Sequence, residues 1–116
     1  MLNDSCLFCK IIKRQIPSKA VFENDEMMAF EDIRPQAPVH VIIVPKNHIE
    51  TLASATDTDT LTVGKLVMAA REIARSKGIE KAGYRVVINC NKDAGQEVFH
   101  IHVHLLGGRK FTWPPG

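Results

Sequence analysis

The stretch Phe99-His100-Ile101-His102-Val103-His104-Leu105 carries three of the five histidines of the chain at alternate positions. Side chains alternate between the two faces of a β-strand, so the pattern predicts a strand over residues 99–105 with His100, His102 and His104 on one face. A strand rises about 3.3 Å per residue, which would bring the three imidazoles within reach of one small anion or one metal ion. The apolar residues between them would then face the core.

This predicted histidine face suits two chemistries. Three imidazoles could hold a catalytic zinc ion, which lowers the pKa of a bound water to about 7. Alternatively, one neutral imidazole attacks a phosphorus atom while the others donate hydrogen bonds to the phosphate and a proton to the leaving group. The spacing alone leaves both open. The loop at residues 91–96, with Gly95, and the lack of an adjacent carboxylate base favour the phosphate chemistry.

Size and composition point to one globular unit. The chain has 116 residues, of which 45% are hydrophobic and 24% are charged, and we expect a single domain over residues 1–116. The net charge is +2 and no run of Lys or Arg suits a nucleic-acid or membrane surface, so we expect neither partner. The longest apolar run, around residues 41–44, is too short to cross a membrane, and the N-terminus has no signal-peptide pattern. We therefore expect a cytoplasmic protein.

The rest of the chain predicts an α+β fold. Prolines and Asn/Asp turn residues separate short runs rich in β-branched and aromatic residues, which is typical of antiparallel strands. A short helix is expected between residues 4 and 14, before Pro17. The expected strands are residues 20–23, 27–32, 39–44, 84–90 and 99–105.

Residues 56–77 are predicted to form the one long helix, because their apolar residues recur with a period of 3.6. Asp57 or Asp59 can cap its start, and Gly78 can end it in a left-handed conformation. Met68 is expected to fill gaps in the core. The apolar stripe comprises Val63, Leu66, Val67, Ala70, Ile73 and Ala74.

Cys6 and Cys9 form a Cys-x-x-Cys pair that would lie one turn apart on the first helix. Two thiolates at this spacing can bind zinc at about 2.3 Å each, but the ion needs two more ligands, for which His48 and His100 are candidates. On spacing alone, two reduced cysteines packed as small hydrophobic residues fit nearly as well. A redox pair is disfavoured because no strand of a βαβ unit precedes it.

The C-terminal tail, residues 110–116, is apolar and rich in proline. Such a segment cannot form a helix or a central strand. Its Trp113 is therefore expected to pack across a surface, for example at a subunit boundary.

The stretch His100-Ile101-His102-Val103-His104-Leu105-Leu106 matches a His-φ-His-φ-His-φ-φ signature, where φ is apolar, and so resembles the histidine-triad (HIT) family. The surrounding sequence is similar to its Hint branch of purine nucleoside phosphoramidases. The resemblance implies a HIT fold, with a five-stranded antiparallel sheet, one long helix and one short N-terminal helix. It also implies a homodimer in which the tail of one subunit approaches the partner's site. Further matches are Lys10-Ile11-Ile12, Ile16-Pro17, Phe30, Asp32-Ile33, Pro35-Gln36-Ala37-Pro38, His40, Gly83-Tyr84-Arg85, Asn89, Gly95-Gln96, Gly107-Gly108-Arg109 and Trp113-Pro114-Pro115-Gly116.

For the chemistry, the resemblance implies hydrolysis of the P–N bond of purine nucleoside 5′-phosphoramidates, with aminoacyl adenylates as further candidate substrates. His102 would be the nucleophile, forming a covalent nucleotidyl-histidine intermediate from which water releases AMP or GMP. His104 would contact the phosphate and help to protonate the leaving amine. His40 and His100 would orient and polarise the nucleophile. The implied substrate-binding residues are Phe30, Asp32, Ile33, Asn89, Gly95, Gln96, Glu97, His102 and His104.

Among these residues, Phe30 and Ile33 would line the base pocket, and Asp32 would accept hydrogen bonds from the ribose hydroxyls. Glu97 departs from the animal members of the branch, which carry a small hydroxyl residue there. A carboxylate cannot donate a hydrogen bond to phosphate at neutral pH, so only the backbone N–H of Glu97 is expected to contribute. The sequence also leaves open a non-enzymatic nucleotide-binding or interaction module.

Cys6 and Cys9 are a second departure, since many Hint proteins lack the pair. A subset of related bacterial proteins has it, together with histidines that match His48 and His100, and binds zinc. The resemblance thus implies a structural zinc ion with four protein ligands, which the chemistry itself does not require. A metal-bound His100 could influence the nucleophile only through its backbone or through the rigidity of the strand.

Overall fold

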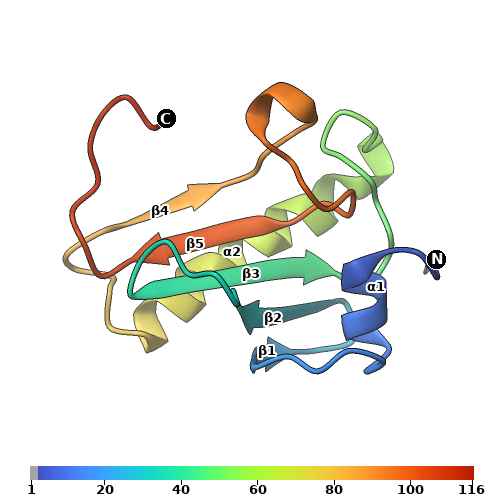
Figure 1. The fold of residues 1–116 in the computed structure, drawn as a ribbon, viewed down its shortest axis with the longest axis horizontal. Helices are drawn as coiled ribbons and strands as arrows, with labels where there is room; N and C mark the ends of the chain where they lie inside the picture. Colours follow the sequence, from blue (N-terminus) through green and yellow to red (C-terminus); the bar gives the residue numbers. More distant parts are fainter. Residues whose placement is uncertain (1–2) are drawn as a thin grey trace.

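The computed structural model describes residues 3–116 and has an antiparallel sheet of five strands with one long helix across one face (Figure 1). The strands lie in the order β1-β2-β3-β5-β4, and all neighbours are antiparallel. This is the α+β architecture that the sequence predicts. The strands are β1 (Ala20–Glu23), β2 (Met27–Glu31), β3 (Val39–Pro45), β4 (Tyr84–Val87) and β5 (Val103–Gly107). The helices are α1 (Leu7–Ile12) and α2 (Thr60–Ser76), with 3-10 turns at Asp57–Asp59 (η1) and Lys92–Ala94 (η2).

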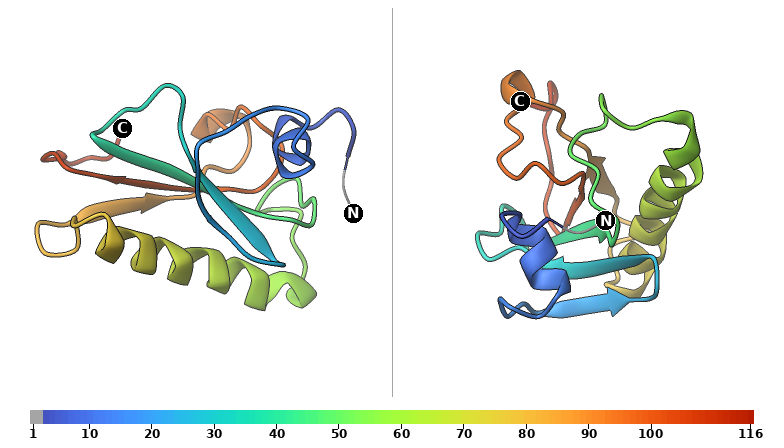
Figure 2. Two further views of the ribbon diagram at one scale, coloured as in Figure 1. Left: turned by 90° about the horizontal axis from the view of Figure 1, so that it is seen from below. Right: turned by 90° about the vertical axis from the view of Figure 1, so that its right-hand side faces the viewer.

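Both faces of the sheet carry an apolar layer, and Figure 2 shows the two helices at opposite faces. Helix α2 covers one face, and α1 lies at the other, near one end of the strands. Residues of β2 and β3 alternate between the two layers because side chains alternate along a strand. The α2 layer takes Met27, Ala29, Val41, Ile43, Val103 and Leu105, and the α1 layer takes Met28, Phe30, Ile42 and Val44.

Helix α2 buries a narrower stripe than the sequence predicts. Its fully or largely buried residues are Leu66, Ala70, Ile73 and Ala74, which recur at the spacing of one helix face. Val67 and Met68 are 38% and 47% exposed, so their predicted core roles are wrong in the single chain. Each residue turns the helix by about 100°, which carries the two side chains that follow Leu66 away from the sheet. The C-terminal prediction is confirmed, since Gly78 has a φ of 76° just after the helix.

Two predicted strands, residues 84–90 and 99–105, differ from the observed ones by more than one residue at an end, and the two differences share one reason. The strand expected over residues 99–105 is wrong at its start, because β5 begins only at Val103. The backbone N–H of Ile101 instead donates to the carbonyl of Ile49, at 2.6 Å, and leaves the ladder. The strand expected to reach residue 90 therefore ends at Val87, which pairs with His104 and has no ladder partner beyond it.

The C-terminal tail is held by arginine contacts. Arg85 donates a hydrogen bond to the carbonyl of Thr112, and the Arg109 guanidinium lies 4.2 Å from the centre of the Phe111 ring. Trp113 remains 83% exposed within the single chain. Along residues 3–116, no helix combines the length and hydropathy needed to cross a bilayer.

Candidate active site and metal centre

The three alternating histidines do not serve one site, which corrects the prediction that one anion or metal ion lies within reach of all three. Only His104 lies in β5, where it pairs with Ile42 of β3. His100 and His102 precede the strand, and the ring of His100 is fully buried toward α1, 6.0 Å from the Phe8 ring. The separation follows from the break in the ladder before Val103, because strict alternation of side chains holds only within a paired strand. His102 and His104 stay together, with ring centres 4.9 Å apart.

His102 is held in one tautomer by the backbone. Its Nδ1–H donates to the carbonyl oxygen of His100 at 2.8 Å, which leaves the lone pair on Nε2. The ring is 6% exposed and meets the edge of the Phe8 ring at 5.0 Å. Burial lowers the pKa of His102, against the opposing effects of the His100 carbonyl and Asp32. An uncharged imidazole with a free Nε2 is the form that can act as a nucleophile.

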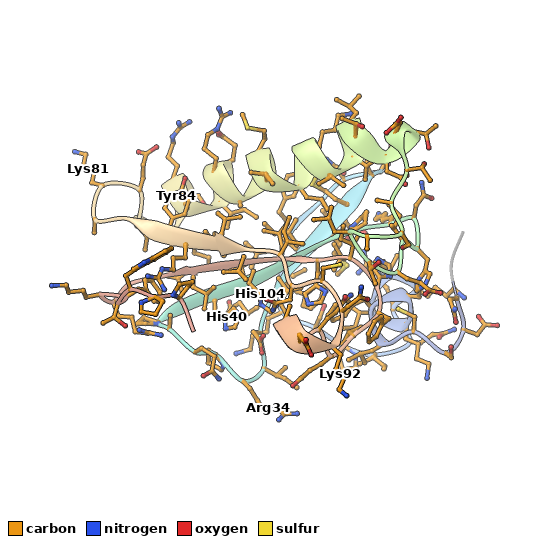
Figure 3. All side chains as sticks on the ribbon, turned by 90° about the horizontal axis from the view of Figure 1, so that it is seen from above. Arg34, His40, Lys81, Tyr84, Lys92 and His104 are labelled. Atoms are coloured by element: carbon orange, nitrogen blue, oxygen red, sulfur yellow. The ribbon has the colours of Figure 1, made fainter. Side chains whose placement is uncertain are left out.

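His40 and His104 form a hydrogen-bonded pair beside His102, which we call the histidine relay. The backbone N–H of Gln36 donates to His40 Nδ1 at 3.0 Å, so the proton of neutral His40 lies on Nε2. His40 Nε2 lies 2.9 Å from His104 Nδ1, which must therefore accept and leave the His104 proton on Nε2. Figure 3 shows the two rings side by side on the face of the sheet opposite α2.

Burial keeps the histidine relay neutral. It lowers the pKa of His104 to about 4, with further lowering from His102 and His40, and Asp32 acts in the opposite direction. Burial also lowers the pKa of His40, partly offset by the Asp32 carboxylate, whose Oδ2 lies 3.4 Å from His40 Nε2. The outward-facing group of the relay is thus a neutral N–H donor on His104.

Asp32, His40 and His104 also bring three possible metal-ligand atoms within 4.8 Å of one another. A metal bound at His40 Nε2 would move the imidazole proton to Nδ1. That proton would face the backbone N–H of Gln36, which already points at Nδ1 from 3.0 Å. Two facing donors are unfavourable, so the geometry favours a hydrogen-bond relay over a metal site here.

A cavity of about 490 Å³ adjoins His102 and His104. It gathers most of the predicted substrate-binding residues from separate parts of the chain, β2 with the following loop on one side and the loop before β5 on the other. Ile33 is 90% exposed at this cavity. The predicted residues that line it are Phe30, Asp32, Ile33, Asn89, Gly95, Glu97, His102 and His104, joined by His40.

Gln96 is the exception among the predicted substrate-binding residues. Its side chain is buried and bonded within the protein rather than facing the cavity. Its Oε1 accepts from the N–H of Asn91 at 2.8 Å, and its Nε2 donates to the carbonyls of Glu50 and Val98. The residue therefore fixes the shape of the loop that carries Gly95 and Glu97.

Cys6, Cys9, His48 and His100 form the second group, which we call the metal cluster. Four possible ligand atoms, one from each residue, lie within 4.8 Å of one another. His100 Nδ1 lies 3.4 Å from Cys6 Sγ, 3.5 Å from Cys9 Sγ and 3.2 Å from His48 Nδ1. Cys9 Sγ also lies 3.4 Å from His48 Nδ1. The predicted ligands thus converge on one point, although they come from α1, the segment after β3 and the segment before β5.

These distances fit a tetrahedral zinc ion. Two sulfur and two nitrogen ligands at usual zinc bond lengths lie about 3.3 to 3.8 Å from one another. Burial lowers the pKa of His100 to about 4, which keeps its ring neutral with a free lone pair, and it raises the pKa of the Cys9 thiol. A divalent cation would bind that lone pair and offset the cost of the buried Cys9 thiolate. A hollow of about 380 Å³, lined by Cys6, His48, Glu50 and Glu97, gives access to the cluster.

Comparison with known proteins identifies the family. A family model described as HIT domain matches residues 13–111. The chain belongs to the HIT family. The match contains His48 and the three alternating histidines, whereas Cys6 and Cys9 lie before it. The comparisons name no branch within the HIT family, so the Hint-like assignment stays a prediction.

Several HIT relatives match almost the whole chain. A Synechocystis protein described as HIT-like and uncharacterized is 47% identical over 115 residues, covering 99% of this chain and all of its own. A maize protein named 14 kDa zinc-binding protein is 48% identical over 118 residues, covering 99% of this chain and 91% of its own. The crystal structure of a HIT family hydrolase from Legionella pneumophila is 50% identical with a TM-score of 0.94, covering 96% of this chain and 99% of that one. A histidine triad protein from Clostridium difficile is 41% identical with a TM-score of 0.93, covering 97% of each chain.

Sequence reasoning missed the parts of this HIT site that come from the backbone and from α1. The carbonyl of His100 and the N–H of Gln36 decide the tautomers of His102 and His40. Backbone groups carry no sequence signal of their own. Phe8, which packs against His102, is an ordinary apolar residue in a helix pattern, and only the folded structure brings it to the site.

Proposed function

We propose that this HIT-family chain is a hydrolase that cleaves the P–N bond of purine nucleoside 5′-phosphoramidates, with aminoacyl adenylates as further candidate substrates. The observation that carries the proposal is the neutral His102 ring, whose unshared Nε2 lone pair adjoins a nucleotide-sized cavity next to the N–H donor of His104. The similarity of this chain to a protein described as a HIT family hydrolase supports a hydrolytic reaction.

In the proposed reaction, His102 Nε2 attacks the phosphorus and the P–N bond breaks. The leaving nitrogen takes a proton from solvent and a hydrogen bond from the neutral His104 Nε2–H, and it departs as an amine. The covalent intermediate is a nucleotidyl group on His102. Water then attacks the phosphorus, its oxygen replaces His102, and one of its protons passes to the solvent, so that AMP or GMP is released. The His100 carbonyl keeps the proton of His102 on Nδ1 throughout.

The substrate would lie in the cavity of about 490 Å³. We assign the base to Phe30 and Ile33, the ribose hydroxyls to Asp32, and the phosphate to Asn89, Gly95 and the backbone N–H of Glu97. The cavity is lined by three carboxylic acids and one arginine, Glu31, Asp32, Glu97 and Arg34, while burial keeps its histidines neutral. This charge distribution favours an amine as the leaving group over a second, phosphate-rich group.

We further propose that Cys6, Cys9, His48 and His100 bind a structural zinc ion. Their mutual distances and donor types support this assignment, as does the name of the maize relative. When bound, zinc would join α1 to the segment that follows β3 and the segment that precedes β5. Elemental analysis of protein purified without a chelator should find one zinc per chain, and its absence would remove the assignment.

We also propose a homodimer. The edge strand β4 and the exposed apolar side chains of α2 offer a boundary, and the exposed Trp113 could reach the partner's site. The large apolar residues of α2 that are exposed are Leu61, Val67 and Met68. Light scattering coupled to size-exclusion chromatography should give twice the chain mass, and a mass of one chain would contradict the dimer.

The function is tested by comparing the wild type with His102→Asn on an adenosine phosphoramidate. Asparagine keeps a polar side chain but has no nucleophilic ring nitrogen, so turnover should fall by about 10³-fold or more while AMP still binds. Equal rates would overturn the proposed reaction. Tight AMP binding by the wild type, with no turnover of any phosphoramidate tried, would instead support the non-enzymatic binding module.

A further inference from the structure

The peptide unit between His100 and Ile101 lies between the metal cluster and the proposed nucleophile. Its carbonyl accepts the Nδ1–H of His102 at 2.8 Å, and its N–H donates to the carbonyl of Ile49 at 2.6 Å. Both hydrogen bonds are short, and the His102 ring is almost completely buried. Rotation or displacement of this single peptide unit would therefore change the orientation of the His102 ring.

Two members of the metal cluster, His100 and His48, are directly linked to the groups that hold this peptide unit. His100 supplies the carbonyl through its backbone and Nδ1 to the cluster through its ring. His48 supplies its own Nδ1 to the cluster, 3.2 Å from that of His100, and is followed directly by Ile49. A single ion bound by the two rings would thus restrain both the carbonyl of His100 and the carbonyl of Ile49, which accepts the N–H of the same peptide unit.

Few hydrogen bonds restrain this part of the chain, although its three side chains are buried. Residues 100–102 lie outside the strand ladder, which begins at Val103, so sheet hydrogen bonds do not fix them. Outside the metal cluster, the His100 ring makes one hydrogen bond, from Nε2–H to the carbonyl of Pro45, at 2.8 Å. Within the cluster, His100 Nδ1 lies 3.2 Å from His48 Nδ1 and 3.4 and 3.5 Å from the sulfurs of Cys6 and Cys9, and the two sulfur contacts are weak as hydrogen bonds. Bonds of about 2.0 to 2.3 Å to a shared zinc ion would be far stiffer.

We propose that the metal cluster positions the nucleophile: a divalent cation on Cys6, Cys9, His48 and His100 fixes the His100–Ile101 peptide unit and so holds His102 Nε2 toward the cavity. This inference rests on the proposed function for the role of His102. It makes Cys6, Cys9 and His48 positioning residues, since they act on the reaction only through the His100–Ile101 peptide unit. Binding of the nucleotide itself does not depend on them, because none of the three lines the cavity of about 490 Å³.

Nitrogen NMR tests the link without relying on activity. Protein with ¹⁵N-labelled histidine is compared at pH 7 in zinc-loaded form and after chelation under reducing conditions. The zinc-loaded form should show His102 as a single Nδ1–H tautomer, and the metal-free form should show its two nitrogen shifts moving toward each other as the ring becomes free to reorient. His40 is the internal control, since its Nδ1 is fixed by Gln36 and should not change. Identical His102 spectra in both forms would overturn the inference.

Kinetics give a second readout. Metal removal should lower kcat for the phosphoramidate by tenfold or more, because a displacement of about 1 Å at a reacting atom can cost about 10²-fold. KM should change by less than threefold. His48→Gln should have the same effect as chelation, whereas Cys90→Ser, at the cysteine outside the cluster, should retain zinc and the wild-type kcat. Equal kcat with and without zinc would contradict the positioning role. If neither form turns over any phosphoramidate, the proposed function fails, and the His102 spectra still decide the link.

Circular dichroism is recorded on every sample, because a structural ion can be required for folding. If the metal-free protein is unfolded, zinc-loaded and cadmium-loaded proteins are compared instead. Cadmium is larger and forms longer bonds, so it should displace the His100 backbone. A change in the His102 nitrogen shifts, with His40 unchanged, would support the link, and no change would overturn it.

Discussion

Lowering the pH tests the histidine relay most directly. His104 can accept from His40 and donate outward only while it is neutral, because a second proton on Nδ1 would face the His40 N–H at 2.9 Å. The groups that face His104 are His40, His102 and Asp32. Burial and the two histidines lower the pKa of His104 to about 4, and the Asp32 carboxylate opposes them. Because the active form is the neutral one, a lowered pKa extends activity to more acidic solution, and activity is lost only as the pH falls through about 4.

The size of the effect follows from the two pKa values. At pH 5.5 an imidazole with a pKa of 4 is about 97% neutral, whereas one with the ordinary value of 6.5 is about 9% neutral. Between pH 7.5 and pH 5.5, kcat/KM for an adenosine phosphoramidate should therefore stay nearly constant if burial controls His104. It should fall about tenfold if His104 titrates like an exposed histidine.

The assay is hydrolysis of the adenosine phosphoramidate from about pH 3.5 to 8, with the rate of spontaneous P–N cleavage subtracted at each pH. Zinc content and circular dichroism are measured alongside, so that metal loss or unfolding is not mistaken for titration. Asp32→Asn removes the one group that raises the pKa of His104, and it should shift the acidic fall in kcat/KM to still lower pH. A fall centred near pH 6.5 in folded, zinc-loaded wild type would refute the reasoning.

Three further predictions concern stability and the tail. A Cβ at Gly107 would lie 2.5 Å from Ile79 Cδ1, so Gly107→Ala should destabilise the protein by about 1–3 kcal/mol in urea unfolding. An unchanged free energy of unfolding would contradict this packing. Arg85→Ala removes the hydrogen bond to Thr112 and should speed chymotryptic cleavage after Phe111, which an unaltered rate would disprove. Chelation should lower the thermal midpoint by several degrees, and re-addition of zinc should restore it, as binding only to the folded state requires.

The elements predicted correctly are those whose signals are local. The hairpin of β1 and β2 follows from turn residues between apolar runs, and Asn24 does accept from two backbone N–H groups in the turn. Helix α2 follows from its period and from Gly78. Val67 and Met68 were assigned to the core wrongly because a periodic pattern gives the direction of the apolar face but not the width of the surface that the sheet covers.

The sequence predicts two centres, a histidine site and a zinc site, but it counts His100 in both. Alternation placed His100 beside His102 and His104, whereas the Pro45 carbonyl and the two cysteines, all distant in sequence, hold its ring in the metal cluster. No local pattern can report such partners.

Backbone groups also decide what each cluster of ligand-type side chains can do. The relay and the metal cluster both gather imidazoles with acidic or thiol groups within 4.8 Å. In the relay, the N–H of Gln36 points at His40 Nδ1 and forces the proton onto the nitrogen that a metal would need. In the metal cluster, the Pro45 carbonyl accepts from His100 Nε2–H and leaves Nδ1 as a lone pair facing both thiols. The same side-chain chemistry therefore becomes a proton-holding pair in one place and a cation site in the other. Between the relay and the metal cluster, the carbonyl of His100 sets the tautomer of His102. Three backbone groups, the N–H of Gln36 and the carbonyls of Pro45 and His100, therefore determine the roles of His40, His100 and His102.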